Sequence, residues 1–424
     1  MCKKCEVLHI APAWLLLLVL TANGIAAAAQ TEITHFMYAS HNVIWQQYLE
    51  TMASRFEATT GIKVNIVPSS GNYREKLMTL IAAGVPPDVT DAHPVLAAPL
   101  VKQKLFEDLR PYVERDRIPV QEMAPAAIAG TTGPDGYLWG LPVSILPIVT
   151  IFNVDLFAQN GLPNPRQLGE NWTWDTLRQS ARRLTGDVNG DGVTDTWGTS
   201  RIHYRWEAQV HQAGTLVYDT LVNPTKSNWN SPATLQAFEF LNELLNVDKV
   251  NSPNYQVNDM PQETVGFTVV DGPGTIYLPA VWDVTVPPKG PANRSSRVNP
   301  DGFQVIALSE KKEAAWQWVK FLVGSVENQM EMARITQRLP SLRQAMQRYP
   351  TVASDLPANW PAYIETAFSP DAYAGYVLFN AEAIDPVVNS HLSNIWNGRA
   401  APATILQQIH EQVSAIMDYY AQQQ

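Results

Sequence analysis

The alternation of apolar and polar positions predicts a strand–helix–strand unit near the start of the chain. Residues 33–39 form an extended apolar run, and residues 62–66 alternate apolar and polar side chains as a half-solvated strand does. Between them, four apolar residues recur at every fourth position, as on one face of a helix: Ile44, Tyr48, Met52 and Phe56. Gly61 is placed to end that helix with a left-handed cap. A βαβ unit this compact predicts a parallel sheet.

The next segments continue this α/β pattern. Residues 73–83 predict a helix that ends at two prolines, and a short strand follows at Val89. Residues 137–143 and 148–152 are two extended apolar segments that lie close together in the sequence. The first part of the chain is therefore expected to form a mostly parallel sheet covered by helices.

The later part of the chain is expected to be mainly helical. The predicted helices cover these ranges: 174–184, 235–247, 311–323 and 405–420. Thr173 is expected to cap the first of them, with Asp175 in its first turn, where a negative charge suits the helix dipole. Residues 264–277 and 303–308 predict strands that could rejoin an early sheet. Residues 283–301 are rich in Pro, Gly, Asn and Ser and predict an exposed loop.

The N-terminal segment has the pattern of a secretion signal. Two lysines near the start precede residues 11–20, a short apolar core, and Ala27 and Ala29 supply the small residues that a signal peptidase accepts. A membrane-spanning helix is the alternative, but it needs about 20 continuous apolar residues. The apolar run is interrupted at Thr21. We therefore expect cleavage after Ala29, so that the exported chain begins at Gln30.

The positions of the cysteines extend this expectation. Cys2 and Cys5 are the two cysteines of the chain, and both lie within residues 1–29. The exported chain would then have no disulfide, no zinc–thiolate site and no cysteine nucleophile. A bacterial lipid anchor uses a cysteine directly after the apolar run, where this chain has alanine. We expect an unanchored protein that a closed compartment retains, the periplasm of a two-membrane bacterium.

Charge and composition narrow the range of partners. The chain has 30 Lys and Arg against 40 Asp and Glu, a net charge of −10; without Lys3, Lys4 and Glu6 the counts are 28 and 39, a net charge of −11. Nucleic acids and anionic membranes bind basic surfaces, so neither is expected as a partner. At 46% hydrophobic residues, the chain is globular and long enough for two lobes. Most of its 13 Trp and 15 Tyr must pack in cores, but flat aromatic faces also hold sugar rings.

Eight short motifs occur in the order that one protein family shows. They lie at residues 56–64 (FEATTGIKV), 87–89 (PDV), 105–112 (LFEDLRPY), 136–142 (GYLWGLP), 152–163 (FNVDLF to GLP), 172–175 (WTWD), 302–316 (GFQVIA to AAW) and 339–341 (LPS). On these motifs the chain resembles the extracellular solute-binding proteins of the sugar-type family (family 1) that serves bacterial ABC importers. The similarity runs through most of residues 30–424.

The resemblance implies an α/β fold of the two-lobed periplasmic-binding-protein kind (type II-like), with a hinge between the lobes and a helix-rich C-terminal part. The N-terminal lobe would contain residues 30–145 and 303–335, and the C-terminal lobe residues 146–302 and 336–424. A sugar-class ligand would bind in the cleft, and the lobes would close over it. The permease subunits of the importer would then recognise the closed form. No enzymatic activity is implied, and a monomer is expected.

Two loops at one sheet edge supply the first candidate ligand contacts. Ligands favour the carboxyl edge of open α/β sheets, and family members bind ligand there. Ser40, His41 and Asn42 follow the first strand, although Asn42 could instead only cap the next helix. Asp91 and His93 follow a later strand in the equivalent position. Asp91 could accept hydrogen bonds from two sugar hydroxyls, and a plain loop turn is the alternative.

Aromatic residues are the candidates for stacking on a sugar: Trp206, Tyr277, Trp282 and Trp396. Trp206 lies in a predicted helix, where core packing is the alternative. The family commonly carries a stacking tryptophan, in Gly-Pro-Trp or Gly-x-Trp, after a late strand. This chain has DGPG at residues 271–274 instead. Either Tyr277 or Trp282 replaces that tryptophan, or the ligand is not a simple stacked sugar.

An Asp-rich loop resembles the beginning of a calcium-binding loop. Its candidate metal ligands are Asp187, Asn189, Asp191, Val193 and Asp195. The twelfth position is Gly198 rather than a bidentate glutamate, so a complete EF-hand is excluded. Similar loops in relatives imply a structural Ca²⁺, and no other cofactor is expected. A tight Asn-Gly-Asp-Gly turn without metal is the alternative.

The sequence favours a binding protein, and three alternatives stay open. There is no P-loop, no HExxH and no G-x-S-x-G. A glycosidase-like pair of carboxylates needs only proximity in space, so a secreted carbohydrate-active hydrolase is one alternative. A calcium-stabilised surface protein without a small ligand is another. A receptor for glycerol phosphate or a related polyol phosphate would need clustered cations, for which Arg201, Arg205 and Arg343 are the candidates.

Overall fold

The first strand–helix–strand unit forms as its hydrophobic pattern predicts. The computed structural model describes residues 30–422, except residues 92, 254–263, 271 and 274–280. β1 (Glu32–Met37) and β2 (Lys63–Pro68) pair in parallel, and α1 (Asn42–Thr60) connects them. Gly61 adopts φ 73° and its amide donates to the Glu57 carbonyl. The helix therefore ends with the expected left-handed cap.

One position of the pattern predicted for α1 is wrong. Ile44 is 46% exposed, whereas the buried face of the helix runs through Trp45, Tyr48, Met52 and Phe56. These four residues follow the three- and four-residue spacing of a single helical stripe. The stripe begins at Trp45, so the side chain of Ile44, one residue earlier, points away from it.

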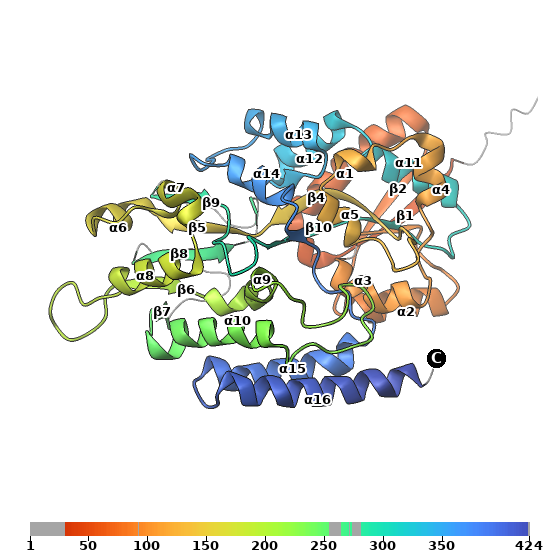
Figure 1. Ribbon diagram of the computed structural model, residues 1–424. Coiled ribbons are helices and arrows are strands. Elements are labelled where there is room, and N and C mark those ends of the chain that lie inside the picture. Colours follow the sequence, from red (N-terminus) through yellow and green to blue (C-terminus); the bar gives the residue numbers. More distant parts are fainter. Residues whose placement is uncertain (1–29, 92, 254–263, 271, 274–280, 423–424) are drawn as a thin grey trace, which may run out of the picture.

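Two separate sheets organise the molecule (Figure 1). The larger has the order β11-β4-β10-β3-β1-β2, with β12 paired to β10, and the smaller has the order β7-β6-β8-β5-β9. The other strands of the larger sheet are β3 (Val89–Thr90), β4 (Leu141–Pro147), β10 (Ser296–Val305), β11 (Leu339–Pro340) and β12 (Ala372–Tyr373). Those of the smaller sheet are β5 (Val149–Asn153), β6 (Trp197–Ser200), β7 (Asn251–Ser252), β8 (Val265–Val270) and β9 (Trp282–Thr285).

Helices surround both sheets. With the larger sheet lie α2 (Tyr73–Ala82), α3 (Pro94–Lys102), α4 (Arg110–Asp116), α5 (Pro125–Ala129), α11 (Lys312–Val323), α12 (Val326–Thr336), α13 (Arg343–Arg348) and α14 (Pro361–Ala367). With the smaller sheet lie α6 (Val154–Gln159), α7 (Pro165–Leu168), α8 (Trp174–Leu184), α9 (Trp206–Gln212), α10 (Pro232–Asn242), α15 (Ala381–Trp396) and α16 (Pro402–Ala421). α15 and α16 pack together along the lower edge of Figure 1. Of the short turns, η1 (Ala39–His41) and η4 (Ile202–Arg205) lie near the candidate site.

Each sheet has its own apolar core, so the chain folds as two lobes. Trp45 and Trp318 belong to the core of the first lobe, and Trp172 and Phe238 to that of the second. The chain passes from β4 to β5 at Ile148 and returns along β10. The predicted two-lobed α/β fold is thereby confirmed. The predicted boundaries at 145/146 and 302/303 fall inside β4 and β10, strands that the structure keeps whole.

The prediction of an exposed loop over residues 283–301 is wrong. β9 occupies the first part of that range, and β10 begins at Ser296, within it. Val284 and Val298 are fully buried. The Pro, Gly and Asn residues that suggest a loop are concentrated between these two strands. The average composition of the range therefore hides two short, buried strands at its ends.

The predicted start of α8 is confirmed. Thr173 is the N-cap, and its hydroxyl accepts a hydrogen bond from the Thr176 amide at 3.3 Å. Asp175 lies in the first turn, where it suits the helix dipole. Across the described ranges, no helix combines the length and the apolar character that crossing a bilayer requires.

Candidate functional site

Asp91 lies at the carboxyl end of β3, fully buried against the loop that follows β1. Its carboxylate accepts hydrogen bonds from the Tyr38 amide and from Trp45 Nε1, both at 2.6 Å. His41 Nδ1 lies 3.1 Å from the other side of the same carboxylate group, at Oδ2. Burial alone would raise the pKa of Asp91, but protonated His41 and these donors hold it below its usual range. Both carboxylate oxygens of Asp91 are thus bonded to groups of the protein.

His41 lies between two carboxylates. Its Nδ1 faces Asp91, and its Nε2 lies 3.4 Å from Asp301 Oδ1. Both ring nitrogens can donate only when the imidazole is protonated. Burial lowers the pKa of His41, but Asp91 and Asp301 outweigh it and raise the pKa to about 9. His41 is therefore a buried cation at neutral pH.

Two residues that the sequence did not point to complete this cluster. Asp301 in β10 forms an ion pair with Arg338, which precedes β11, and accepts a hydrogen bond from Ser144 in β4 at 3.4 Å. The Arg338 guanidinium also lies 4.9 Å from the centre of the Trp45 ring. The pKa of Asp301 is lowered, because Arg338 and His41 outweigh the effect of its burial. Asp301 was missed because it lay within the predicted loop.

The geometry changes the roles predicted for this edge of the sheet. His41 and Asp91 are buried and paired with each other, so they organise the loop rather than offer free groups to a sugar. Asn42 Oδ1 accepts from the Ile44 and Trp45 amides, which is the capping alternative. His93 is half-buried and contributes electrostatically to Asp301. The side chain of Ser40 lies outside the described residues.

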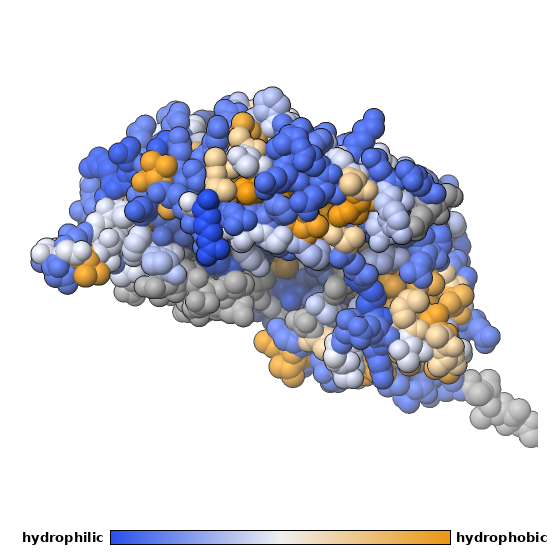
Figure 2. Space-filling model, turned by 90° about the horizontal axis from the view of Figure 1, so that it is seen from below, coloured by the Kyte–Doolittle hydropathy of each residue, from blue (hydrophilic) through white to orange (hydrophobic). Residues whose placement is uncertain are grey.

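A pocket of about 230 Å³ lies in the second lobe, next to β10. Its lining residues come from α9, the loop that follows it, β10, the segment before α15 and α15 itself: Trp206, Glu207, Tyr218, Trp229, Arg297, Tyr376, Leu378, Ala381, Asp385, Val388 and Asn389. On the side of α15 and α16, the surface is hollowed between two masses of the molecule, and hydrophilic residues border the hollow (Figure 2).

Aromatic rings form one wall of this pocket. The Trp206 ring is half-buried, and its centroid lies 5.0 Å from that of the buried Trp229. Tyr218 packs edge-on against both Trp229 and Tyr376. Trp206 therefore packs on the core with part of its ring and leaves the rest at the pocket. Core packing, the alternative given for this residue, is realised for part of the ring, and stacking on a sugar stays a prediction.

The polar groups of the pocket are of mixed charge. Glu207 Oε1 lies 3.7 Å from Arg297 Nη1, and Asp385 borders the same pocket from α15. Arg297 also donates to Asn299 through Nε. Two carboxylates, one guanidinium and the amide of Asn389 therefore face the space beside the aromatic wall. Such a combination of flat apolar faces and hydrogen-bonding groups is typical of small-molecule sites.

One strand connects the pocket with the cluster around His41. Arg297, Asn299 and Asp301 are alternate residues of β10, so their side chains share one face of the strand. Arg297 lines the pocket, and Asp301 contacts His41. The candidate site is thus a continuous polar row that runs along β10 from the second lobe into the first.

A model of the bacterial extracellular solute-binding protein family matches residues 38–329 of this chain. The match covers more than half of the sequence. The chain belongs to this family. Both the family and the similar structures are substrate-binding proteins rather than enzymes, which confirms the prediction of a non-enzyme.

Individual relatives of this solute-binding protein are distant but match it over nearly its full length. A protein of Brucella abortus (strain 2308), named as a binding protein, is 24% identical, with 95% of this chain and 97% of the relative covered. The ABC substrate-binding protein from Listeria monocytogenes in complex with cycloalternan has a TM-score of 0.74 at 24% identity, covering 92% and 99% of the two chains. The cyclic alpha-maltosyl-1,6-maltose binding protein from Arthrobacter globiformis has a TM-score of 0.73 at 16% identity, covering 91% and 99%. These structures share the fold.

Two other aromatic candidates, Trp282 and Trp396, do not line the pocket. Trp282 is 3% exposed and belongs to the apolar cluster where the two sheets meet. Trp396 packs against Phe238, with the two rings stacked and their centroids 5.5 Å apart. Tyr277 lies outside the described residues. Of the aromatic candidates among the described residues, Trp206 is the one that lines the pocket; which residue replaces the family's stacking tryptophan stays a prediction.

The three arginines proposed for a phosphate do not form one cluster. The guanidinium groups of Arg201 and Arg205 lie over the ring of Tyr204, at 4.1 and 4.5 Å from its centre. Arg343 lies 3.6 Å from the centre of the Phe368 ring instead. None of these three arginines lines the pocket beside Trp206.

The Asp-rich loop forms a compact turn that its own side chains hold together. Asp187 accepts from the amides of Gly190 and Gly192 at 2.6 and 2.7 Å, and Asp195 accepts from the Val188 amide at 2.8 Å. Hydrogen bonds from these amides, led by that of Gly192, lower the pKa of Asp187. Within the described ranges no group of three His, Cys, Asp or Glu is placed to hold a metal. Calcium binding stays a prediction.

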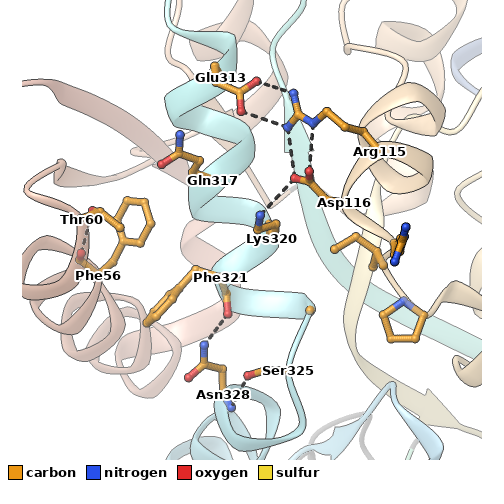
Figure 3. A pocket seen from close by; sticks show the side chains of 14 residues that line it. Phe56, Thr60, Arg115, Asp116, Glu313, Gln317, Lys320, Phe321, Ser325 and Asn328 are labelled. Atoms are coloured by element: carbon orange, nitrogen blue, oxygen red, sulfur yellow. Dashed lines mark hydrogen bonds and ion pairs between the residues drawn. The ribbon is translucent and has the colours of Figure 1, made fainter.

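A second hollow, of about 710 Å³, lies on the first lobe between α1, α4 and α11 (Figure 3). Four of its charged residues pair with one another: Arg115 bonds both Asp116 and Glu313, and Lys320 lies 3.1 Å from Asp116. Asp116 also accepts from Trp316 Nε1 at 2.7 Å. Because these groups already satisfy one another, the hollow is a surface groove braced by ion pairs.

Proposed function

We propose that this solute-binding protein binds a neutral sugar or oligosaccharide between its lobes and delivers it to the permease of an ABC importer. The pocket beside Trp206 carries the proposal, because it combines a half-buried aromatic face with hydrogen-bonding groups. An aromatic face packs against the apolar C–H face of a sugar ring, and carboxylates accept from its hydroxyls. The named ligands of the Listeria and Arthrobacter proteins, which are cyclic oligosaccharides, support the same class.

The charge of the pocket favours a neutral ligand over a phosphate. Glu207 and Asp385 outnumber Arg297, so the pocket lacks the excess of positive charge that a phosphate requires. Arg201 and Arg205 pack on Tyr204, and Arg343 lies on a different aromatic residue. The polyol-phosphate alternative therefore lacks the clustered cations that it requires.

The transport role rests on an equilibrium between open and closed lobes. Trp206 and Asp385 belong to the second lobe, while Tyr38 and His93 lie at the sheet edge of the first. A sugar that contacts both sets of residues does so only when the lobes are closed, so binding shifts the population toward that state. The permease recognises the closed form.

The location of the protein is part of the proposal. Residues 1–29 act as a cleavable signal, and the exported protein is an unanchored monomer in the periplasm. Intact-mass analysis of protein purified from a periplasmic extract tests this proposal. A chain that begins at Gln30 supports it, and a lipid-modified or membrane-bound form contradicts it.

A thermal-shift screen tests the ligand class. We expect at least one neutral saccharide, from a panel of tagatose, maltotriose, mannotriose and cycloalternan, to raise the melting temperature; saturation at 100 times the Kd adds about 2.7 kcal/mol of stability. Stabilisation by glycerol 3-phosphate alone would instead support the polyol-phosphate reading. New reducing ends after incubation with the oligosaccharides would identify a hydrolase and contradict the proposal.

A further inference from the structure

Four charged side chains are buried together outside the pocket. Asp91 and Asp301 are 0% and 3% exposed, and the side chains of His41 and Arg338 are 7% and 12% exposed. Each group contacts the next in the order Asp91, His41, Asp301, Arg338, so that negative and positive charges alternate. With His41 protonated, the net charge of the four is zero. Removing charged side chains from water costs free energy. Packed apolar residues in place of a buried ion pair often give a core at least the same stability. The cluster therefore calls for a role beyond stability.

One end of this cluster is attached to the strands that connect the lobes. Asp301 belongs to β10, at the residue where the register of β10 against β4 shifts. Ser144 of β4 donates to Asp301, and Arg338 directly precedes β11. The Asp301 carboxylate of β10 thus contacts Ser144 of β4 and Arg338, the residue before β11, on the strands along which the chain passes between the lobes.

The other end holds the loop at the ligand edge of the first lobe. The Tyr38 amide and the His41 ring both bond Asp91. Asn42 adopts φ 73°, a left-handed conformation that is unfavourable for a residue other than glycine. Trp45 Nε1 bonds Asp91, and the Trp45 ring lies beneath Arg338. These contacts fix a loop conformation that the local sequence alone does not favour.

We propose that Asp301 and Arg338 are positioning residues of the binding site, which act through His41 and Asp91 to set the loop from Tyr38 to Asn42 relative to the hinge strands. The inference rests on the proposed function, because it assumes that a sugar contacts this loop. Asp301 does not line the pocket, yet it shares one face of β10 with the pocket residue Arg297. The shared strand therefore links the position of the loop to that of the pocket wall.

The linkage needs the proton on His41, since only the imidazolium donates to both carboxylates. The charged and titratable groups that face this cluster are Asp91, Asp301, Arg338, His35, His93, Tyr48 and Tyr73. Burial lowers the pKa of His41, but the two carboxylates raise it more, to about 9. The loop should therefore stay fixed through neutral pH and loosen as the pH rises through that value.

Three measurements on the exported chain test this linkage. Asp301→Asn and Arg338→Gln each remove one partner of the ion pair at the end of the cluster beside the hinge strands. Asp248→Asn is the matched control. Asp248 is also a buried carboxylate paired with an arginine, Arg178, but it lies in the other lobe. The readouts are hydrogen exchange of the amides of residues 38–45, the NMR titration midpoint of His41, and the affinity for maltotriose.

Both hinge-end variants should speed exchange at residues 38–45 at least tenfold relative to wild type and weaken maltotriose binding about tenfold. Asp301→Asn should also lower the His41 midpoint, because it removes one of the two carboxylates that raise the pKa of this histidine. Asp248→Asn should change none of these by more than twofold, even where it lowers the melting temperature. Unchanged exchange and an unchanged His41 midpoint in folded Asp301→Asn protein would overturn the proposal. If wild-type protein binds neither maltotriose nor any other saccharide of the panel, the ligand assignment fails, while exchange and titration still test the linkage.

Discussion

Arg74 of α2 and Glu382 of α15 form an ion pair that joins the two lobes. Tyr73 and Leu77 anchor α2 in the apolar core of the first lobe, whereas Ile384 anchors α15 in that of the second. Nearby, Lys102 of α3 lies 5.7 Å from the centre of the Tyr420 ring of α16. The lobes therefore touch at a second place, where α2 and α3 meet α15 and α16 (Figure 1).

Glu382→Gln should weaken sugar binding without lowering stability. The pair can form only when the lobes are close, so its loss disfavours the closed state that binds the ligand. Exposed ion pairs contribute at most about 1 kcal/mol, which corresponds to up to about fivefold in affinity. Calorimetric titration with the best saccharide of the screen measures this loss. Glu411→Gln is the control, because the Glu411 carboxylate accepts a hydrogen bond from Gln407 of its own helix and so does not link the lobes; equal losses in both variants would contradict the account.

The stability of the wild-type protein should fall as the pH rises from about 7 to 9.5. The pKa of His41 is raised from 6.5 to about 9 in the folded protein. A raised pKa contributes stability that is complete below the unfolded value and is lost as the pH rises through the folded value. Urea unfolding at a series of pH values measures this loss. His41→Gln should be less stable at pH 7 and should lack this alkaline slope; a slope unchanged in the variant would assign it to another group.

A different histidine should limit stability on the acid side. His35 is buried, and its burial lowers its pKa from 6.5 to about 4. The unfolded chain takes up a proton there below pH 6.5 while the folded protein does not, so stability is lost as the pH falls from 6.5 to 4. His35→Gln retains an acceptor for Trp318 Nε1, which donates to His35 Nδ1 at 3.0 Å. The variant should show a shallower decline of melting temperature over that range, and an equal decline would refute the assignment.

Gly198 should not tolerate a side chain. A Cβ at this position of β6 would lie 2.3 Å from the backbone of Ala181 in α8. Because backbone cannot move aside as a flexible side chain can, Gly198→Ala should cost at least about 2 kcal/mol in the free energy of unfolding. Gly186→Ala is the matched control, since its Cβ would meet no atom within 4 Å. Urea denaturation should separate the two, and similar midpoints would contradict the close packing of α8 on β6.

Local patterns in the sequence predict the helices and the strand–helix–strand unit well. Gly61 ends α1 and Thr173 begins α8 because each cap depends on residues within one turn of it. The same local reasoning fails for residues 283–301, where a run of turn-forming residues separates two strands. Those strands are recognisable only by their pairing with β4 and β5, which lie about 130 to 160 positions earlier in the chain.

The candidate site was only partly predictable for the same reason. His41 and Asp91 were identified from their positions after strands, and the structure brings them together. Their roles depend on Asp301 and Arg338, which approach from more than 200 residues away. No local pattern distinguishes a carboxylate that a buried histidine neutralises from one that faces a ligand.

Isothermal titration of the exported chain with neutral saccharides is the most direct test of the sugar-binding account. We predict that wild-type protein binds at least one saccharide of the panel and that Trp206→Ala weakens this binding more than tenfold, as loss of a central aromatic contact does. Trp360→Ala is the control, because Trp360 is also partly buried but packs where the two sheets meet, away from the pocket. Its affinity should stay within twofold of wild type. Absence of binding to every saccharide, or equal losses in the two tryptophan variants, would contradict the account.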